Sequence, residues 1–130
     1  MKLEAICPPD APAPIAPYSP GVLSRAGGPL LFISGQIAID PSTQQFAGGS
    51  VADQTRLALA NLRAVLLAAG GDMHNVAKTT IYLRDMDDFP LVNEVYGTAF
   101  QAPYPARATV QVARLPRDAA VEIDAMAVLP

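Results

Sequence analysis

The chain has 130 residues, with nine Lys and Arg against 12 Asp and Glu, which gives a formal net charge of −3. This length is close to the commonest domain size, so we expect a single domain over residues 1–130 with one hydrophobic core. The acidic balance disfavours a protein that coats nucleic acid, and a hydrophobic content of 51% excludes a disordered chain.

Cysteine usage and hydropathy indicate a protein of the reducing cytoplasm. Cys7 is the only cysteine, so no intramolecular disulfide can form. The first residues include Glu4 and lack an apolar run of signal-peptide length. No 18 consecutive apolar residues are available to cross a bilayer. We therefore expect a soluble, cytoplasmic protein without an export signal.

The N-terminal third is rich in proline and then in short β-prone runs. Six prolines within residues 8–20 remove backbone donors, which favours an extended loop, with Ile15 and Tyr18 as apolar anchors against the body of the domain. Residues 22–25 and 30–36 are strand-like and are separated by turn residues 26–29, which predicts a β-hairpin. Residues 40–43 (DPST) predict a type I turn.

Two amphipathic helices flank a strand in the middle of the chain. Ser50 and Asp53 resemble a capping box that opens a helix over residues 51–69, and a Gly-Gly pair ends it. Residues 76–84 alternate between apolar and polar side chains, which is typical of a half-buried strand. Acidic caps and an early proline at residues 87–90 open a second helix, with apolar residues at helical spacing between positions 91 and 100.

The last two strands, residues 107–112 and 119–128, predict the architecture and a polar face. Together the elements indicate an α+β fold in which both helices cover one face of the sheet. When the apolar residues of both strands share the core face, an antiparallel pair places Val110 opposite Val121. Arg107 and Thr109 then lie beside Glu122 on the face away from the helices.

The pair of Arg107 and Glu122 has two interpretations. It is an ordinary cross-strand ion pair on a solvated face, or it is a site for a carboxylate substrate. In the second case the guanidinium binds the carboxylate in bidentate fashion, while Glu122 orients or deprotonates a water. Because Met126 and Val128 continue this face with apolar surface, we expect another subunit to cover part of it, with the site between subunits.

Other motifs favour structural roles. His74 has no second histidine or cysteine at ligand spacing, so we expect no metal site. The glycine pairs at 27–28, 48–49 and 70–71 match neither the dinucleotide fingerprint nor the phosphate loop. Ser34 lacks the spaced glycines of a nucleophile elbow, and Cys7 is interpreted as an incidental thiol.

Several segments together resemble the RidA (YjgF/YER057c) family, over nearly the whole chain. They are residues 13–21 (APIAPYSPG), 32–37 (FISGQI), 59–62 (LANL), 68–70 (AAG), 105–107 (PAR), 113–116 (ARLP) and 121–123 (VEI). The resemblance implies a chorismate-mutase-like α+β fold and a homotrimer with clefts between adjacent subunits. It also implies hydrolysis of reactive enamines and imines, such as 2-aminoacrylate, to 2-oxo acids and ammonia without a cofactor.

The resemblance further implies roles for individual residues. Arg107 matches the arginine that holds the substrate carboxylate, and Glu122 matches the acid that orients the attacking water. The other pocket positions by this match are Tyr18 in the loop that closes the cleft, Asn93 on the second helix, and Ser34 with Gly35 on the lining strand. Thr109, a substrate-binding position where many members carry Cys, and Ala16, where Gly is common, are departures that bear on substrate choice.

Three alternatives to a general imine deaminase stay open. One is a pathway-specific deaminase for a larger enamine acid such as 2-aminomuconate. Another is a non-catalytic trimer that binds 2-oxo acids through Arg107. The third, the ribonuclease activity ascribed to some relatives, is disfavoured by the net charge of −3 and the lack of a basic stripe. In each of the first two cases the expected partner is a small carboxylate, not a nucleic acid or a membrane.

Overall fold

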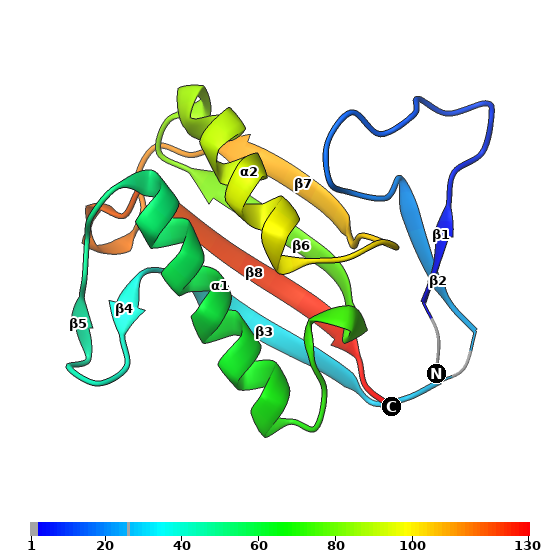
Figure 1. Ribbon diagram of the computed structural model, residues 1–130, viewed down its shortest axis with the longest axis horizontal. Helices are drawn as coiled ribbons and strands as arrows, with labels where there is room; N and C mark the ends of the chain where they lie inside the picture. The colour runs from blue at the N-terminus through cyan, green and yellow to red at the C-terminus, as the bar shows by residue number, and fades with distance from the viewer. Residues whose placement is uncertain (1–2, 26) are drawn as a thin grey trace.

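A four-stranded sheet carries both helices on one face in the computed structural model, which describes residues 3–25 and 27–130 (Figure 1). The strands lie in the order β3 (Leu30–Gln36), β8 (Val121–Val128), β6 (Val76–Leu83) and β7 (Ala106–Gln111). β8 is antiparallel to β3 and to β6, whereas β6 and β7 are parallel. The predicted α+β class, with both helices on one face, is confirmed, and the sheet is mixed and mostly antiparallel.

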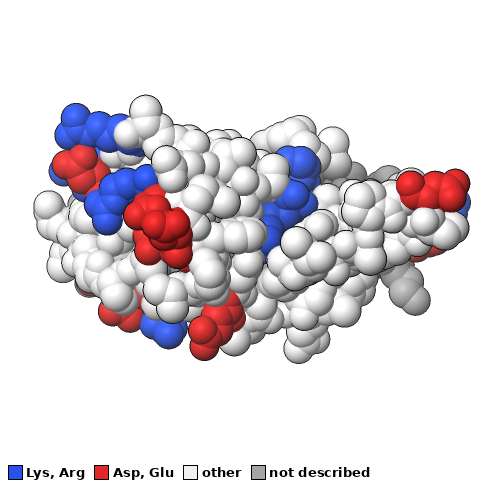
Figure 2. All heavy atoms as spheres, turned by 90° about the horizontal axis from the view of Figure 1, so that it is seen from above, with Lys and Arg blue, Asp and Glu red and all other residues white. Residues whose placement is uncertain are grey.

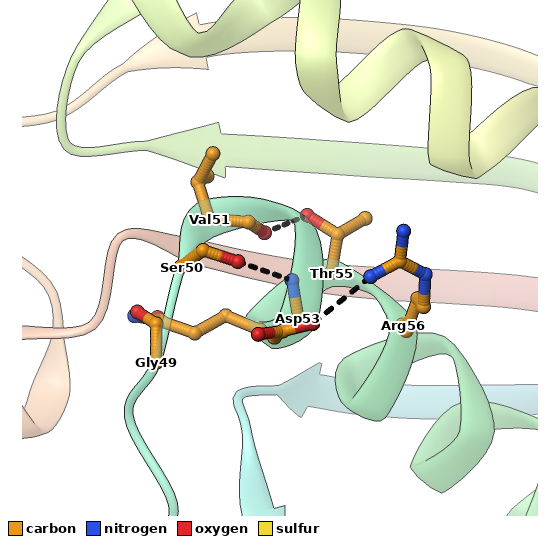
Figure 3. Close-up of polar contacts among 7 residues, drawn as sticks. Gly49, Ser50, Val51, Asp53, Thr55 and Arg56 are labelled. Atoms are coloured by element: carbon orange, nitrogen blue, oxygen red, sulfur yellow. Dashed lines mark hydrogen bonds and ion pairs between the residues drawn. The ribbon is translucent and has the colours of Figure 1, made fainter.

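Helix α1 (Val51–Ala68) begins where the sequence predicts. The Ser50 side chain accepts a hydrogen bond from the backbone nitrogen of Asp53 at 3.1 Å, while the Asp53 carboxylate pairs with Arg56 at 2.9 Å (Figure 3). An N-cap of this kind satisfies one of the backbone donors that every helix leaves free at its start. The buried Gln54 then ties the helix start to the sheet, because its Oε1 accepts from the backbone nitrogen of Ala120.

The core fills the space between the helix pair and the sheet. Helix α2 (Phe89–Ala99) starts with a proline in its first turn, although the side chain of its N-cap residue, Asp88, makes no capping hydrogen bond. Along β6 and β8, alternate side chains face the helices, as their sequence patterns predict. The side chains that are almost completely buried in this layer are those of Leu62, Leu66, Ile81, Leu83, Val92, Tyr96, Val121 and Ile123. Within residues 3–25 and 27–130, neither helix is long and apolar enough to cross a membrane.

Short elements connect the main ones. The predicted turn at residues 40–43 is confirmed: it joins β4 (Ile39–Asp40) to β5 (Gln45–Phe46), and Asp40 Oδ1 accepts from the Ser42 nitrogen at 2.9 Å. Three 3-10 turns, η1 (Met73–Asn75), η2 (Met86–Asp88) and η3 (Pro116–Asp118), precede β6, α2 and β8.

The N-terminal segment forms an arm whose pairing differs from the prediction. β2 (Gly21–Ser24) pairs with β1 (Leu3–Ile6), not with β3, so the predicted hairpin of residues 22–25 and 30–36 is wrong (Figure 1). Within its predicted turn, Ala26 lies outside the described residues. The Pro29 carbonyl accepts a hydrogen bond from the Leu129 nitrogen, which continues the pairing of β3 with β8 instead of returning the chain to β2.

The proline-rich loop between β1 and β2 is anchored at one end only. Ser19 pairs with Ala106, its nitrogen donates to the Pro105 carbonyl at 3.0 Å, and its hydroxyl donates to the Tyr104 carbonyl. Tyr18 is therefore held against the body, as predicted, whereas Ile15 is 92% exposed and is not an anchor within the chain.

The predicted pairing of the last two strands is also wrong. β7 pairs with β6, with Arg107 beside Thr79 and Thr109 beside Ile81, and both β6 residues are buried under the helices. Arg107 and Thr109 therefore lie on the helix side of the sheet, and Val110 lies 42% exposed on the opposite face. The apolar alternation misled because β7 is an edge strand that follows β6 through a helix, and such a connection makes the two strands parallel.

Candidate functional site

Arg107 is enclosed by aromatic rings. Its guanidinium carbon lies 5.5 Å from the ring centre of Tyr18, 5.5 Å from that of Phe89 and 5.0 Å from that of Tyr96. At these distances the faces of aromatic rings attract a cation. Tyr18 comes from the N-terminal loop and the other two rings come from α2, so two separate segments enclose a side chain of β7.

Helical spacing places three residues of α2 next to β7. Phe89, Asn93 and Tyr96 stand at positions i, i+4 and i+7, which share one face of a helix. The buried Tyr96 hydroxyl lies 2.8 Å from Thr79 Oγ1, which fixes its ring against the sheet. Burial raises the pKa of Tyr96 to about 12, so the hydroxyl stays neutral beside the guanidinium. The sequence pattern places Phe89 and Tyr96 on the helix but does not predict their contact with Arg107, which only the i, i+7 spacing of the two rings could have indicated.

Three polar atoms in this pocket are buried without a hydrogen-bond partner. They are Asn93 Oδ1, Arg107 Nη1 and Thr109 Oγ1, and no other buried side-chain nitrogen or oxygen in residues 3–25 and 27–130 lacks a partner. An unpaired buried polar group costs about 1–3 kcal/mol, so native proteins keep few of them. All three belong to residues that the resemblance assigns to the substrate. We call Tyr18, Phe89, Asn93, Tyr96, Arg107 and Thr109 the Arg107 pocket.

The electrostatics of the Arg107 pocket favour an anion. Burial lowers the pKa of the Arg107 guanidinium, and Tyr96 and Tyr18 act in the opposite direction. An arginine nevertheless stays protonated in a protein, so the pocket holds a partly desolvated cation. None of the ion pairs in the described part of the chain includes Arg107. A carboxylate ligand fits the planar guanidinium group of Arg107, because it accepts two parallel hydrogen bonds from the N–H groups of that side chain.

The remaining predicted site residues form a second group, the Glu122 patch, made of Ser34, Gly35 and Glu122. A side-chain carbon built on Gly35 would lie only 2.1 Å from Glu122 Oε2, so the carboxylate occupies the space that a larger residue would fill. The β3 register against β8 shifts between Ile33 and Gln36, at this same point. Burial first, and then the charge of Asp124, raise the pKa of Glu122.

The two groups lie on opposite faces and toward opposite edges of the sheet. Arg107 projects from edge strand β7 on the helix side, whereas Glu122 is paired with Tyr82 on the face without helices, which we call the open face. The predicted contact between Arg107 and Glu122 within one chain is therefore wrong. The cause is the β7 pairing described above, which turns Arg107 to the other side of the sheet.

Replacing Gly35 by Ala is expected to lower activity at least tenfold with little change in stability. The added carbon must displace the Glu122 carboxylate, and a misplacement of about 1 Å at a reacting group costs about 100-fold in rate in the worst cases. Gly27→Ala is the matched control, because nothing lies within 4 Å of a side-chain carbon there. Steady-state kinetics and thermal melts of both variants check this, and unchanged kinetics in Gly35→Ala would contradict a role for the Glu122 patch.

A separate groove lies between α1 and α2. Among its lining residues, no buried side-chain nitrogen or oxygen lacks a hydrogen-bond partner. Its volume is about 620 Å³, and its polar lining includes the side chains of Arg56, Arg63, Asp72 and His74. Both arginines already pair with aspartates, Arg56 with Asp53 and Arg63 with Asp72, each at 2.9 Å. Neither His74 nor the exposed Cys7 belongs to a cluster of potential metal ligands in the described part of the chain.

The face shown in Figure 2 carries charged side chains of both signs, and one basic group stands apart near its middle. Acidic and basic groups lie next to one another at one end of the molecule. Arg114 and Asp118 form an exposed ion pair, 2.8 Å apart. This face therefore presents no continuous basic stripe of the sort that follows a nucleic-acid backbone.

The chain matches known proteins over most of its length. Residues 8–129 match the family model described as Endoribonuclease L-PSP. The chain belongs to this family, the YjgF/RidA family. The resemblance found in the sequence is thereby confirmed, and it extends over almost the whole chain.

Relatives at about 50% identity carry different names. A RutC family protein of Pyrococcus horikoshii is 48% identical over 124 residues, which cover 95% of this chain and 96% of that protein. The 2-iminobutanoate/2-iminopropanoate deaminase of Mus musculus is 51% identical over 119 residues, covering 91% of this chain and 85% of that protein. The solved structure of E. coli TdcF with bound serine matches with a TM-score of 0.74 at 41% identity, covering 98% of this chain and 99% of that one.

Proposed function

We propose that this protein is a hydrolytic deaminase for reactive enamines and imines of the 2-aminoacrylate and 2-iminopropanoate type, which it converts to 2-oxo acids and ammonia. The observation that carries the proposal is the buried, unpaired Nη1 of Arg107, beside the unpaired atoms of Asn93 and Thr109. A 2-imino acid supplies the missing partners, since its carboxylate accepts hydrogen bonds and its nitrogen donates them. The deaminase names of the mammalian relatives support the same chemistry.

The residues divide the work between binding and proton transfer. Arg107 and Thr109 donate to the substrate carboxylate, Asn93 Oδ1 accepts from the substrate nitrogen, and Tyr18 covers the cleft from the N-terminal loop. The Glu122 carboxylate takes a proton from a water as its oxygen adds to the C=N carbon, and ammonia leaves after proton transfer. Imines also hydrolyse unaided in water, so a small site without a cofactor provides enough acceleration.

The proposed site is shared between copies of the chain in a homotrimer. One copy holds the Arg107 pocket at its β7 edge and the Glu122 patch near its β3 edge. A head-to-tail contact between different edges closes into a ring, in which each copy lends the Arg107 pocket to one neighbour and the Glu122 patch to the other. The exposed apolar side chains of the open face support such a contact. They are Leu30, Phe32, Val110 and Met126.

Imine hydrolysis is the direct test. An amino-acid oxidase generates a panel of imino acids, and semicarbazide traps those that survive. We expect the wild type to lower the yield of trapped product and Glu122→Gln to leave it unchanged. If neither protein lowers it but calorimetry detects 2-oxo-acid binding, the non-catalytic trimer replaces the proposal. If turnover is confined to a larger enamine acid, the pathway-specific deaminase replaces it.

A further inference from the structure

Glu122 has an acidic neighbour that the proposed reaction does not use. Asp124 lies two residues along β8 on the same open face, at about 7 Å by strand geometry. Its Oδ2 accepts a hydrogen bond of 2.9 Å from the Tyr82 hydroxyl. Tyr82 is directly opposite Glu122 in the β6 register, so β6 holds the second carboxylate beside the first.

Few other charges face Glu122. The facing titratable groups are Asp124 on its own strand and Tyr82 and Arg84 on the β6 side, while β3 contributes only the uncharged Ser34 and Gly35. Arg84 is engaged elsewhere, since its Nη1 donates to the Asp118 carbonyl at 2.9 Å. Lys78 lies farther along β6, opposite Met126, and its Nζ is 3.3 Å from Thr80 Oγ1. The charged group nearest to Glu122 along the sheet is therefore a second carboxylate, that of Asp124.

This arrangement opposes ionisation of Glu122. Two carboxylates about 7 Å apart on a partly buried surface disfavour each other's charged form. The pKa of Glu122 is accordingly raised, by burial first and by Asp124 second. The pKa of Tyr82 is raised as well, chiefly by its hydrogen bond to Asp124, so Tyr82 stays a neutral donor that orients that carboxylate.

We infer that Asp124, held by Tyr82, is a positioning residue whose charge disfavours ionisation of Glu122, so that Glu122 acts first as an acid on an enamine and then as a base on water. The inference rests on the proposed function and specifies its substrate further. The site binds and converts the enamine tautomer as well as the imine tautomer. A site with a fully ionised Glu122 could activate water but could not protonate an enamine carbon.

Protons are conserved over one catalytic cycle, and Glu122 ends in the protonated form in which it began. Protonated Glu122 gives its proton to the terminal carbon of the enamine, as the C=C pair forms the new C–H bond and the nitrogen lone pair forms C=N. The Glu122 carboxylate next removes a proton from water as its oxygen adds to the C=N carbon, and the C=N pair returns to nitrogen. Glu122 then protonates that nitrogen and takes the hydroxyl proton as the C–N bond breaks, which releases ammonia and the 2-oxo acid and leaves Glu122 protonated.

The test separates the two tautomers and uses Asp124→Asn, which removes the charge and keeps the shape. Imine is supplied by an amino-acid oxidase and 2-aminoacrylate by a serine dehydratase. We expect Asp124→Asn to shift the acid limb of the kcat/KM profile for imine to lower pH, and to slow enamine turnover relative to imine turnover about threefold at neutral pH. Asp124→Glu, which keeps the charge, is expected to retain the wild-type pH profile and the wild-type ratio of enamine to imine turnover. Asp53→Asn, which removes an exposed charge at the start of α1, is expected to alter neither quantity. Unchanged profiles in Asp124→Asn overturn the inference.

A direct titration distinguishes this inference from the proposed function. The Glu122 carboxyl is followed by carbon-13 NMR, and we expect it to titrate at lower pH in Asp124→Asn than in the wild type. If the wild type hydrolyses no imine while this titration moves as expected, the proposed function fails and the coupling stands. If imine turnover is normal and the titration does not move, only the inference fails. Asp124→Ser, which also removes the charge, takes the place of Asp124→Asn if that variant does not fold.

Discussion

Replacing Arg107 by Met is expected to lower kcat/KM for imine hydrolysis by about 100-fold or more while the protein stays folded. The substitution removes the only cation of the Arg107 pocket, and truncating one partner of a buried, hydrogen-bonded charge pair costs about 2–5 kcal/mol. Stability should not fall, because the lost attraction between the cation and the three rings is offset by removal of the unpartnered Nη1, and Met fills similar space among the rings. The melting temperature is expected to stay level or to rise by a few degrees.

Two further variants make the Arg107 result specific. Arg63→Met removes an exposed arginine that pairs with Asp72 and should leave turnover unchanged. Arg107→Lys keeps the charge but loses the planar fork, so we expect a higher KM with a smaller loss of kcat. Wild-type turnover in Arg107→Met would contradict the carboxylate site, and a large drop in its melting temperature would show that the contacts of Arg107 with the three rings stabilise the fold.

The elements that sequence analysis predicts correctly are those whose signals are local. The capping serine before α1 lies within three residues of the backbone donor that it satisfies, and the alternation along β6 reflects one buried face. Strand pairing is not local in this way. β7 has an apolar alternation that fits a core face equally well, yet the α2 connection places it parallel to β6 with Val110 exposed.

The same distinction between local signals and tertiary contacts applies to the candidate site. Its residues could be named from sequence segments that resemble the family, but their arrangement could not, because Arg107 and Glu122 are 15 positions apart on strands that do not pair. The aromatic cage depends on the packing of α2 and the Tyr18 loop around β7, a tertiary contact without a motif of its own. Sequence rules based on local structure are expected to fail at a functional site, because the residues there are selected for function rather than for stability.

Mixing two inactive variants is expected to recover activity, because the proposed site takes Arg107 from one copy and Glu122 from the next. Arg107→Met and Glu122→Gln are each expected to be inactive as homotrimers. In trimers assembled at random from equal amounts of both, a site is intact when its Arg107 comes from a Glu122→Gln chain and its Glu122 from an Arg107→Met chain. Each condition holds for half of the chains, so about a quarter of the wild-type turnover should return.

The amount recovered distinguishes shared sites from sites within one chain. Co-refolded mixtures are compared with the two variants refolded separately and then combined, which controls for leakage from either parent. A site contained within one chain has no intact copy in any mixture, so its recovery is zero at every mixing ratio. A shared site gives a recovery that rises to a maximum at equal amounts, because the product of the two chain fractions is largest there. The opposite sheet faces that carry Arg107 and Glu122 in one copy lead us to expect this maximum.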